Sequence, residues 1–225
     1  MKLIQQLKDL REEMTLSSKW QDVQQYLPSW VEKVNLGENT TGCLLDVGCH
    51  YGLISVHYIK KTNQNAYGFD VNPRMNALLE KNIYGSVFEG KFIVQGYGLS
   101  NENKITRSYS DSKYSGITTI DPEQLTTIKG LTGANLEEDC LVEVKRLDDV
   151  PFFEKIAVIK IDCEGSEPDV LMGAVEVIKK NYPIIIFEAL TPTKLGDCKK
   201  ILHELAYEIH PLDERNFIAK KREKE

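Results

Sequence analysis

The chain has 225 residues with a mean hydropathy of −0.34, and its 41% hydrophobic and 28% charged residues exclude a disordered or fibrous protein. Its net charge of −6 is unusual for a protein that binds nucleic acid, so we expect no nucleic-acid partner. The five cysteines are scattered and lack CxxC spacing, which predicts neither a disulfide framework nor a zinc site. The N-terminus has no signal-peptide core, and no apolar run is long enough to span a bilayer, so we expect a soluble cytoplasmic protein.

Residues 1–35 are expected to form an N-terminal helical extension. Apolar side chains recur at helical spacing from Leu3 to Met14, which predicts a first helix. The capping-box patterns Ser18-x-x-Gln21 and Ser29-x-x-Glu32 predict two more helices that begin directly after each serine, separated by Pro28. We interpret the extension as a cover for the core, and the alternative is a lid that selects the substrate.

From residue 43 onward, short apolar runs alternate with amphipathic stretches. Runs of Val, Ile, Leu and Phe predict strands that are buried on both faces, at residues 43–47, 66–69, 91–95, 157–161 and 183–187. Amphipathic stretches predict helices at residues 52–61, 73–82, 167–180 and 193–205. The alternation is typical of an α/β sandwich around a mostly parallel sheet, followed by an antiparallel hairpin of residues 207–212 and 217–221.

Residues 100–149 interrupt this alternation. The segment is rich in Ser, Thr, Asn, Asp and Gly, with short β-like pieces at residues 105–109, 117–120 and 141–144. We expect an irregular insertion over the mouth of the site, within one domain that covers residues 36–225. A loop that makes no contact with substrate is the alternative interpretation.

The sequence Gly48-Cys49-His50-Tyr51-Gly52 follows a buried strand and opens a helix. Glycines let the backbone approach a ligand closely, and a helix N-terminus offers unpaired N–H groups. His50 occupies the position of the second glycine of the dinucleotide fingerprint, so we expect a nucleotide-like ligand without a pyrophosphate. The alternative is a tight turn between strand and helix that binds nothing.

Asp70 follows the second predicted strand, 22 residues after Gly48. A carboxylate at this position can accept hydrogen bonds from both hydroxyls of a ribose. The alternative is that Asp70 caps the next helix, an interpretation that the following Asn72-Pro73 supports.

Carboxylates gather at the predicted strand ends. The strand that ends at residue 161 is followed by acidic residues and then by a Ser166-x-x-Asp169 capping pattern with Pro168 in the first helical turn. Because the carboxyl ends of parallel strands share one edge of a sheet, that edge is expected to hold Asp46, Asp70, Asp162, Glu164 and Glu188. Clustered like charges destabilise a protein unless a cation or a cationic ligand uses them, although each carboxylate alone could be a helix cap or a turn former.

Four stretches of the chain resemble FkbM-type class I methyltransferases: DVGCHYG (46–52), VQGYGLSNENK (94–104), IKIDCEGSEPDVLMGA (159–174) and IIIFEAL (184–190). The resemblance spans about residues 44–221 and is most specific in the third stretch. It implies the Rossmann-like class I methyltransferase fold, S-adenosylmethionine as the cofactor and methylation of a hydroxyl, most often on a sugar of a glycan or glycoconjugate. Two departures from the family pattern are the bulky residues between the two glycines of the first turn and a glycine at position 98, where alanine is common.

The resemblance also implies roles for individual residues. Those expected to bind the cofactor are Asp46, Gly48, Cys49, His50, Tyr51, Gly52, Asp70, Gly96, Tyr97, Gly98, Leu99 and Asp162. Asp162 and Glu164 are expected to face the methyl group and the acceptor, with His50 or His210 as alternative general bases. The residues expected to bind the acceptor are Tyr109, Tyr114 and Glu188. A divalent metal that bridges the carboxylates to two sugar hydroxyls is the less favoured alternative.

Two other functions stay open at this point. The acceptor of the methyl group could be a protein, an RNA or another small molecule, although the acidic balance argues against RNA. The second alternative is a non-catalytic methyltransferase-like module that binds a glycan or a protein.

Overall fold

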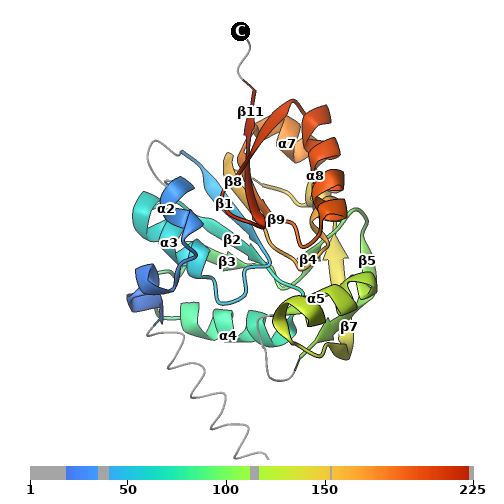
Figure 1. Ribbon diagram of the computed structural model, residues 1–225. Helices are drawn as coiled ribbons and strands as arrows, with labels where there is room; N and C mark the ends of the chain where they lie inside the picture. Colours follow the sequence, from blue (N-terminus) through green and yellow to red (C-terminus); the bar gives the residue numbers. More distant parts are fainter. Residues whose placement is uncertain (1–18, 35–40, 112–116, 153, 223–225) are drawn as a thin grey trace, which may run out of the picture.

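The computed structural model describes residues 19–34, 41–111, 117–152 and 154–222. Its main feature is a seven-stranded sheet in the order β10-β11-β9-β8-β1-β2-β3 (Figure 1). The strands are β1 (Cys43–Val47), β2 (Ala66–Phe69), β3 (Phe92–Val94), β8 (Ile156–Ile161), β9 (Ile184–Glu188), β10 (Tyr207–Pro211) and β11 (Asn216–Lys221). Neighbouring strands from β3 to β9 are parallel, whereas β11 is antiparallel to both β9 and β10. This arrangement confirms the predicted α/β sandwich with a mostly parallel sheet and a final antiparallel hairpin.

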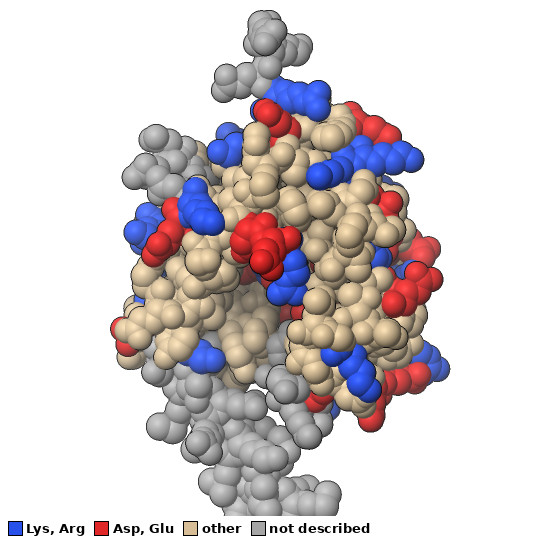
Figure 2. Space-filling model, in the orientation of Figure 1, with Lys and Arg blue, Asp and Glu red and all other residues tan. Residues whose placement is uncertain are grey.

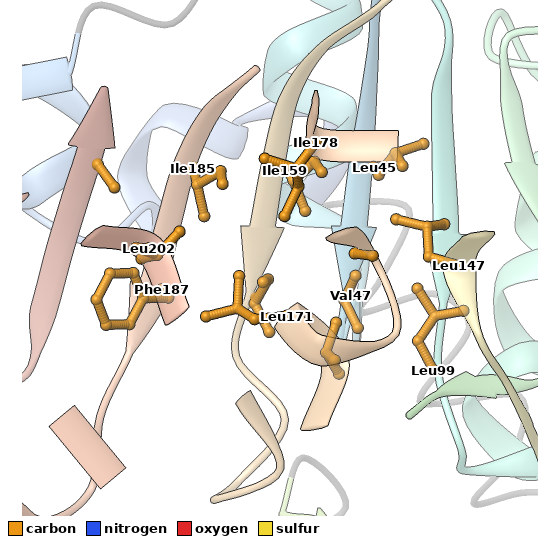
Figure 3. Close-up of a cluster of buried hydrophobic side chains, with 14 of the residues drawn as sticks. Leu45, Val47, Leu99, Leu147, Ile159, Leu171, Ile178, Ile185, Phe187 and Leu202 are labelled. Atoms are coloured by element: carbon orange, nitrogen blue, oxygen red, sulfur yellow. The ribbon is translucent and has the colours of Figure 1, made fainter. Parts of the chain in front are cut away.

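Two hydrophobic cores lie on opposite faces of this sheet, because successive side chains of a strand point to opposite sides. On one face, Leu45, Ile159 and Phe187 pack with side chains of α6, α7 and α8 (Figure 3). On the other face, Leu44 and Val158 pack with side chains of α3 and α4. The covering helices are α3 (Leu53–Thr62), α4 (Pro73–Ile83), α6 (Glu167–Met172), α7 (Val175–Asn181) and α8 (Pro192–Glu204). Burial on both faces explains why the central strands are continuous apolar runs.

The N-terminal extension is described from residue 19 onward. Residues 19–21 are helical and are followed by the 3₁₀ helix η1 (Val23–Tyr26) and by α2 (Trp30–Val34), which begins where its capping pattern predicts. Trp20 and Trp30 join the core beside α3. The helix predicted over residues 3–14 lies outside the described residues. In the described part of the chain, every helix is too short or too polar to cross a bilayer.

The helix predicted over residues 167–180 is broken at Gly173. Helix α6 ends at Met172, and α7 begins at Val175. A Cβ atom at Gly173 would lie 2.0 Å from the carbonyl oxygen of Ser100, and the carbonyl of Gly173 itself accepts the N–H of Asp148 at 2.9 Å. The backbone of another segment therefore passes against this position, a constraint that helical periodicity within residues 167–180 cannot reveal.

The described parts of residues 100–149, which leave out residues 112–116, are not irregular. With β4 they form a second sheet in the order β4-β7-β5-β6, of which β4, β5 and β7 are labelled in Figure 1. The elements of this part are β4 (Gly98–Leu99), β5 (Lys104–Ser110), β6 (Thr118–Thr119), η2 (Pro122–Gln124), α5 (Leu125–Thr132), β7 (Glu137–Lys145) and η3 (Leu147–Asp149). The prediction of irregular structure is wrong because much of β5 and β7 faces solvent, and even Ile105 is 72% exposed. Such strands carry polar residues whose composition is that of a loop.

Candidate active site

A pocket opens at the carboxyl ends of β1, β2 and β8, where open α/β sheets bind their ligands. Figure 2 shows acidic side chains gathered beside a hollow on one side of the molecule, with a basic side chain next to them. The pocket is lined by Val47, Gly48, His50, Phe69, Asp70, Val71, Asn72, Met75, Gly98, Leu99, Thr118, Ile120, Asp162, Cys163, Glu164 and Ser166. The residues among these that were predicted to bind the cofactor are Gly48, His50, Asp70, Gly98, Leu99 and Asp162.

Gly48 and Gly52 are required by the packing of the first turn. Gly48 has a φ of +71°, and a Cβ atom there would lie 1.8 Å from the carbonyl oxygen of Asp162. Gly52 has a φ of +64°, and a Cβ atom there would lie 2.3 Å from the ring of Phe92. The N–H of Gly48 also donates to the carbonyl oxygen of Phe69 at 2.8 Å. The turn is therefore fixed against its neighbouring strands, with the Gly48 backbone in the pocket wall.

Asp70 connects this turn to the start of α4. Its Oδ2 accepts the N–H of His50 at 2.9 Å, and its Oδ1 accepts the N–H of Asn72 at 2.8 Å. The cap of α4 is Asn72, whose Oδ1 accepts the N–H groups of Arg74 and Met75 at 3.0 and 3.4 Å. Asp70 is therefore not the helix cap, and each of its carboxylate oxygens keeps a further acceptor site. Burial raises the pKa of Asp70, although the two N–H donors act to lower it.

Lys160 is a buried cation that the sequence analysis missed, and its signal was a lysine inside an apolar run. It lies opposite Asp46 in the register of β8 and β1. Its Nζ lies 3.3 Å from Asp46 Oδ1 and 3.6 Å from Asp162 Oδ2, and it donates to the carbonyl oxygen of Gly48 at 2.7 Å. Burial lowers the pKa of Lys160, but the two carboxylates raise it to a final value above the ordinary one. The other oxygen of Asp46 accepts the hydroxyl of Ser55 at 2.7 Å, so Asp46 holds Lys160 and α3 behind the pocket.

Glu167 shapes the turn that presents Glu164 to the pocket. Its Oε1 accepts the N–H groups of Cys163 and Gly165 at 2.9 and 3.2 Å. This turn places Glu164 in the left-handed region, with a φ of +55°. The side chain of Ser166 makes no capping hydrogen bond to α6 within the described residues, so the predicted cap is wrong. The carboxylate of Glu167 satisfies the backbone at this corner instead.

Two carboxyl groups at this edge have pKa values above the ordinary range of a glutamate. Burial, together with the charges of Asp162 and Glu167, raises the pKa of Glu164 to about 7. Burial and the charges of Asp162 and Glu164 raise the pKa of Glu188 to about 8 against the opposing charge of Arg215. The Nε of Arg215 lies 3.5 Å from Glu188 Oε1. Neither residue lines the pocket, so Glu188, which was expected to bind the acceptor, lies outside it. Glu164 is thus a pocket group that can accept a proton at neutral pH.

The two histidines expected as alternative bases lie in different places. His50 lines the pocket, but its Nε2 is buried with no hydrogen-bond partner among the described residues, and its ring lies 3.8 Å from that of Tyr51. Burial and the charge of Lys160 lower the pKa of His50 to about 4, so its imidazole is neutral. His210 is exposed on the edge strand β10, with its Nε2 3.5 Å from Glu208, and the fold does not bring it to the pocket.

Other predicted residues lie outside the pocket lining. The cofactor-binding candidates in this group are Asp46, Cys49, Tyr51, Gly52, Gly96 and Tyr97. The ring of Tyr97 packs 5.8 Å from that of Phe69, which does line the pocket. Tyr109 lies in β5 opposite Thr119 and does not line the pocket, and Tyr114 lies outside the described residues.

Thr118 in β6 and Ile120 directly after that strand supply one wall of the pocket, and the sequence analysis did not identify either residue as part of the site. Asn72 Nδ2 donates to Thr118 Oγ1 at 3.1 Å. The hydroxyl of Thr119 donates to the carbonyl oxygen of Glu164 at 2.9 Å. The segment at β6 is therefore attached to the ends of both β2 and β8.

The pocket geometry suits a ligand that carries a ribose. The Gly48 backbone and the Asp70 carboxylate face one cavity, and both oxygens of Asp70 have acceptor capacity left. Among the described residues, no group of three or more His, Cys, Asp or Glu side chains is arranged to hold a metal ion.

Similarity to solved structures is consistent with this geometry. The FkbM methyltransferase of Methylobacillus flagellatus matches with a TM-score of 0.54 and 18% identity over 80% of this chain, and the chain spans 43% of that protein. A protein assigned as an S-adenosyl-L-methionine-dependent methyltransferase from Methanococcus maripaludis matches with a TM-score of 0.52 and 12% identity over 98% of this chain and 92% of its own. At these identities the likeness shows the fold. None of the curated proteins compared with the chain matches it.

The family is shown by a sequence match. The family model described as the methyltransferase FkbM domain matches residues 46–211, which is more than half of the chain and includes both the glycine turn and the Asp162–Glu164 turn. The chain therefore belongs to the FkbM methyltransferase family, and its fold is the class I methyltransferase fold.

Proposed function

We propose that this chain transfers a methyl group from S-adenosylmethionine to a hydroxyl group of a sugar in a glycan or glycoconjugate. The observation that carries the proposal is a single pocket that joins Gly48 and Asp70 to Asp162 and Glu164. The first two residues suit the cofactor, and the two carboxylates suit an acceptor that must lose a proton. The choice of a sugar hydroxyl also rests on the resemblance to FkbM-type enzymes.

Asp70 would hold the ribose of the cofactor through the acceptor sites that the N–H groups of its own turn do not use. The Gly48 backbone would lie beside the cofactor, and Gly98 and Leu99 would border the adenine. When bound, S-adenosylmethionine supplies an electrophilic methyl group. The chain's contribution is then to align the acceptor oxygen and to remove its proton.

Glu164 is the base that we favour. A general base works best when its pKa lies near the working pH, and the pKa of Glu164 is about 7. Asp162 has a different environment, because Lys160 Nζ lies 3.6 Å from its Oδ2. Asp162 would therefore accept hydrogen bonds from acceptor hydroxyls, while Glu164 takes the proton of the attacking hydroxyl.

The acceptor would enter between this pair and the second sheet. Thr118 offers a hydroxyl to a polar acceptor and Ile120 offers an apolar surface, which together suit the two faces of a sugar ring. In this proposal residues 100–149 shape the acceptor side of a domain that spans residues 36–225, and residues 1–35 extend it. All five cysteines are free thiols, which supports a reducing compartment such as the cytoplasm.

The test is incubation of the protein with labelled S-adenosylmethionine and a panel of free sugars, glycans, proteins and RNA. We expect label on a sugar hydroxyl. Asp70→Ala should weaken cofactor binding by tens- to hundreds-fold, because two charge-assisted hydrogen bonds contribute roughly 2–4 kcal/mol. Label found on protein or RNA alone would overturn the sugar assignment. Preference for NAD over S-adenosylmethionine in calorimetry would overturn the cofactor site.

A further inference from the structure

The N-terminal segment Lys19–Val34 lies outside the residues that the family model matches, yet it is built into the core. Trp20 is 4% exposed, and its ring lies 5.5 Å from Phe88 and 6.1 Å from Phe92. Phe92 is the residue whose ring excludes a Cβ atom at Gly52. The segment therefore packs directly behind the Gly48–Gly52 turn.

Trp20 also forms a hydrogen bond to that turn. Its Nε1 donates to the carbonyl oxygen of Tyr51 at 2.8 Å, between residues 31 positions apart in the chain. The backbone of the segment is held in turn, because Lys60 Nζ donates to the carbonyl oxygens of Trp20 and Gln21. Lys19 places its Nζ 4.8 Å from the centre of the Tyr51 ring. The outer side of the turn is thus tied to the extension by a hydrogen bond and by a cation–π contact.

The inner side of the same turn is tied to the pocket. The N–H of His50 donates to Asp70 at 2.9 Å, and the His50 ring lies 3.8 Å from the Tyr51 ring. The turn therefore spans the short distance between Trp20 outside and Asp70 inside. A turn held on one side only would have to be ordered when a ligand binds, and that ordering lowers affinity.

We propose that Trp20 is a positioning residue for the cofactor, which acts by holding the His50–Tyr51 turn in its binding geometry before the cofactor arrives. The role rests on the proposed placement of S-adenosylmethionine against this turn. It gives the extension, which also covers the core through Trp20 and Trp30, a function in cofactor affinity in place of the substrate-selecting lid that the sequence alone offers as an alternative.

The test uses the full chain and two tryptophans that are equally buried. Trp20→Phe keeps an aromatic ring and removes the indole N–H, whereas Trp30→Phe makes the same change at a residue that is also 4% exposed but has no hydrogen bond to the turn among the described residues. We expect Trp20→Phe to weaken S-adenosylmethionine binding in calorimetry roughly three- to tenfold, the size of one lost hydrogen bond. Trp30→Phe should leave the affinity unchanged.

A second readout needs no cofactor. The N–H of His50 donates to Asp70, and the N–H of Gly52 donates to the carbonyl oxygen of Cys49. Hydrogen exchange at these two N–H groups should be faster than in the wild type in Trp20→Phe, and unchanged in Trp30→Phe. If Trp20→Phe folds poorly, Lys60→Gln is the variant to use instead, because Lys60 is more exposed. It should weaken S-adenosylmethionine binding and speed exchange at the same two N–H groups, but by less.

Unchanged exchange and affinity in Trp20→Phe would overturn the proposal. So would equal losses in both tryptophan variants, since these would indicate a general loss of packing. Failure of the underlying cofactor site is distinguishable, because Asp70→Ala would then also leave S-adenosylmethionine affinity unchanged.

Discussion

The buried pair of Lys160 and Asp46 offers the sharpest test of how this fold is held together. Lys160→Met removes the cation and leaves a hydrophobic side chain of similar length in its place. Asp46 then stays in a site where its side chain is 1% exposed, without the Nζ that lay 3.3 Å from Oδ1. Among the described residues, the hydroxyl of Ser55 is then the side-chain group that still donates a hydrogen bond to this carboxylate, at 2.7 Å from Oδ2.

The expected loss of stability is large. Breaking a buried ion pair by removing one partner costs about 3–5 kcal/mol, because an uncompensated charge stays buried. A domain of ordinary stability unfolds with about 5–15 kcal/mol, so the variant should lose a large fraction of its free energy of unfolding. Lys160 also donates to the Gly48 carbonyl at 2.7 Å, a contact that the variant loses as well.

Urea unfolding at pH 7, followed by circular dichroism, measures this loss. The double variant Lys160→Met with Asp46→Asn removes the orphaned charge and should recover at least about half of the lost stability. Lys194→Met is the control, since the pair of Lys194 with Asp121 is 2.8 Å apart but its side chains are each 17% exposed, and it should cost roughly 1 kcal/mol. A Lys160→Met variant within about 1 kcal/mol of the wild type would refute the reasoning.

Two further predictions concern the pocket. Gly48→Ala should destabilise the fold by roughly 3 kcal/mol or more in the same assay, because its Cβ would lie 1.8 Å from the carbonyl oxygen of Asp162. Gly96→Ala is the control: Gly96 has the same φ of +71° but open space around it, so this change should cost only about 1–2 kcal/mol. Equal costs would show that backbone strain alone governs both glycines. Glu164 has a folded pKa of about 7 against an ordinary 4.5, so the folded state holds its proton more tightly and stability should fall as pH rises from about 4.5 to 7. Glu164→Gln should flatten that slope and should be more stable than the wild type above pH 7, by up to about 3 kcal/mol. If unfolding experiments across this range show the same slope in the variant, the raised pKa of Glu164 is contradicted.

Local sequence was sufficient for the main sheet. Strands β1 and β2 have the predicted bounds, because a strand covered by helices on both faces is a continuous apolar run. The glycine turn and Asp70 were also identified from local features, since a strand followed by glycines and a helix has a readable sequence signature. These features depend on residues close together in the chain.

The features that were missed depend on contacts between distant segments. Lys160 meets Asp46 only because β8 pairs with β1 in one particular register, which the two sequences do not specify. The break at Gly173 depends on the backbone of Ser100, and the pocket wall at Thr118 depends on how the second sheet docks. The distance between His210 and the pocket is set by the order of the strands in the sheet, which the sequence does not show, so His210 could not be excluded as a base from the sequence.

The structure shows how most of the carboxylates at one edge of the sheet are stabilised although they carry like charges. Asp46 is paired with Lys160, Asp70 accepts two backbone N–H groups, and Glu188 has Arg215 within 3.5 Å. Within the pocket, Lys160 Nζ lies 3.6 Å from Asp162 Oδ2, whereas burial and the charges of Asp162 and Glu167 raise the pKa of Glu164 against the charges of Arg215 and Lys160. A cationic ligand in this pocket would favour the ionised form of Glu164, because an opposite charge nearby lowers the pKa of an acid. Since the sulfonium of S-adenosylmethionine is positively charged, cofactor binding at the proposed site would itself favour the ionised form of Glu164, which is the form that can accept the proton of an acceptor hydroxyl.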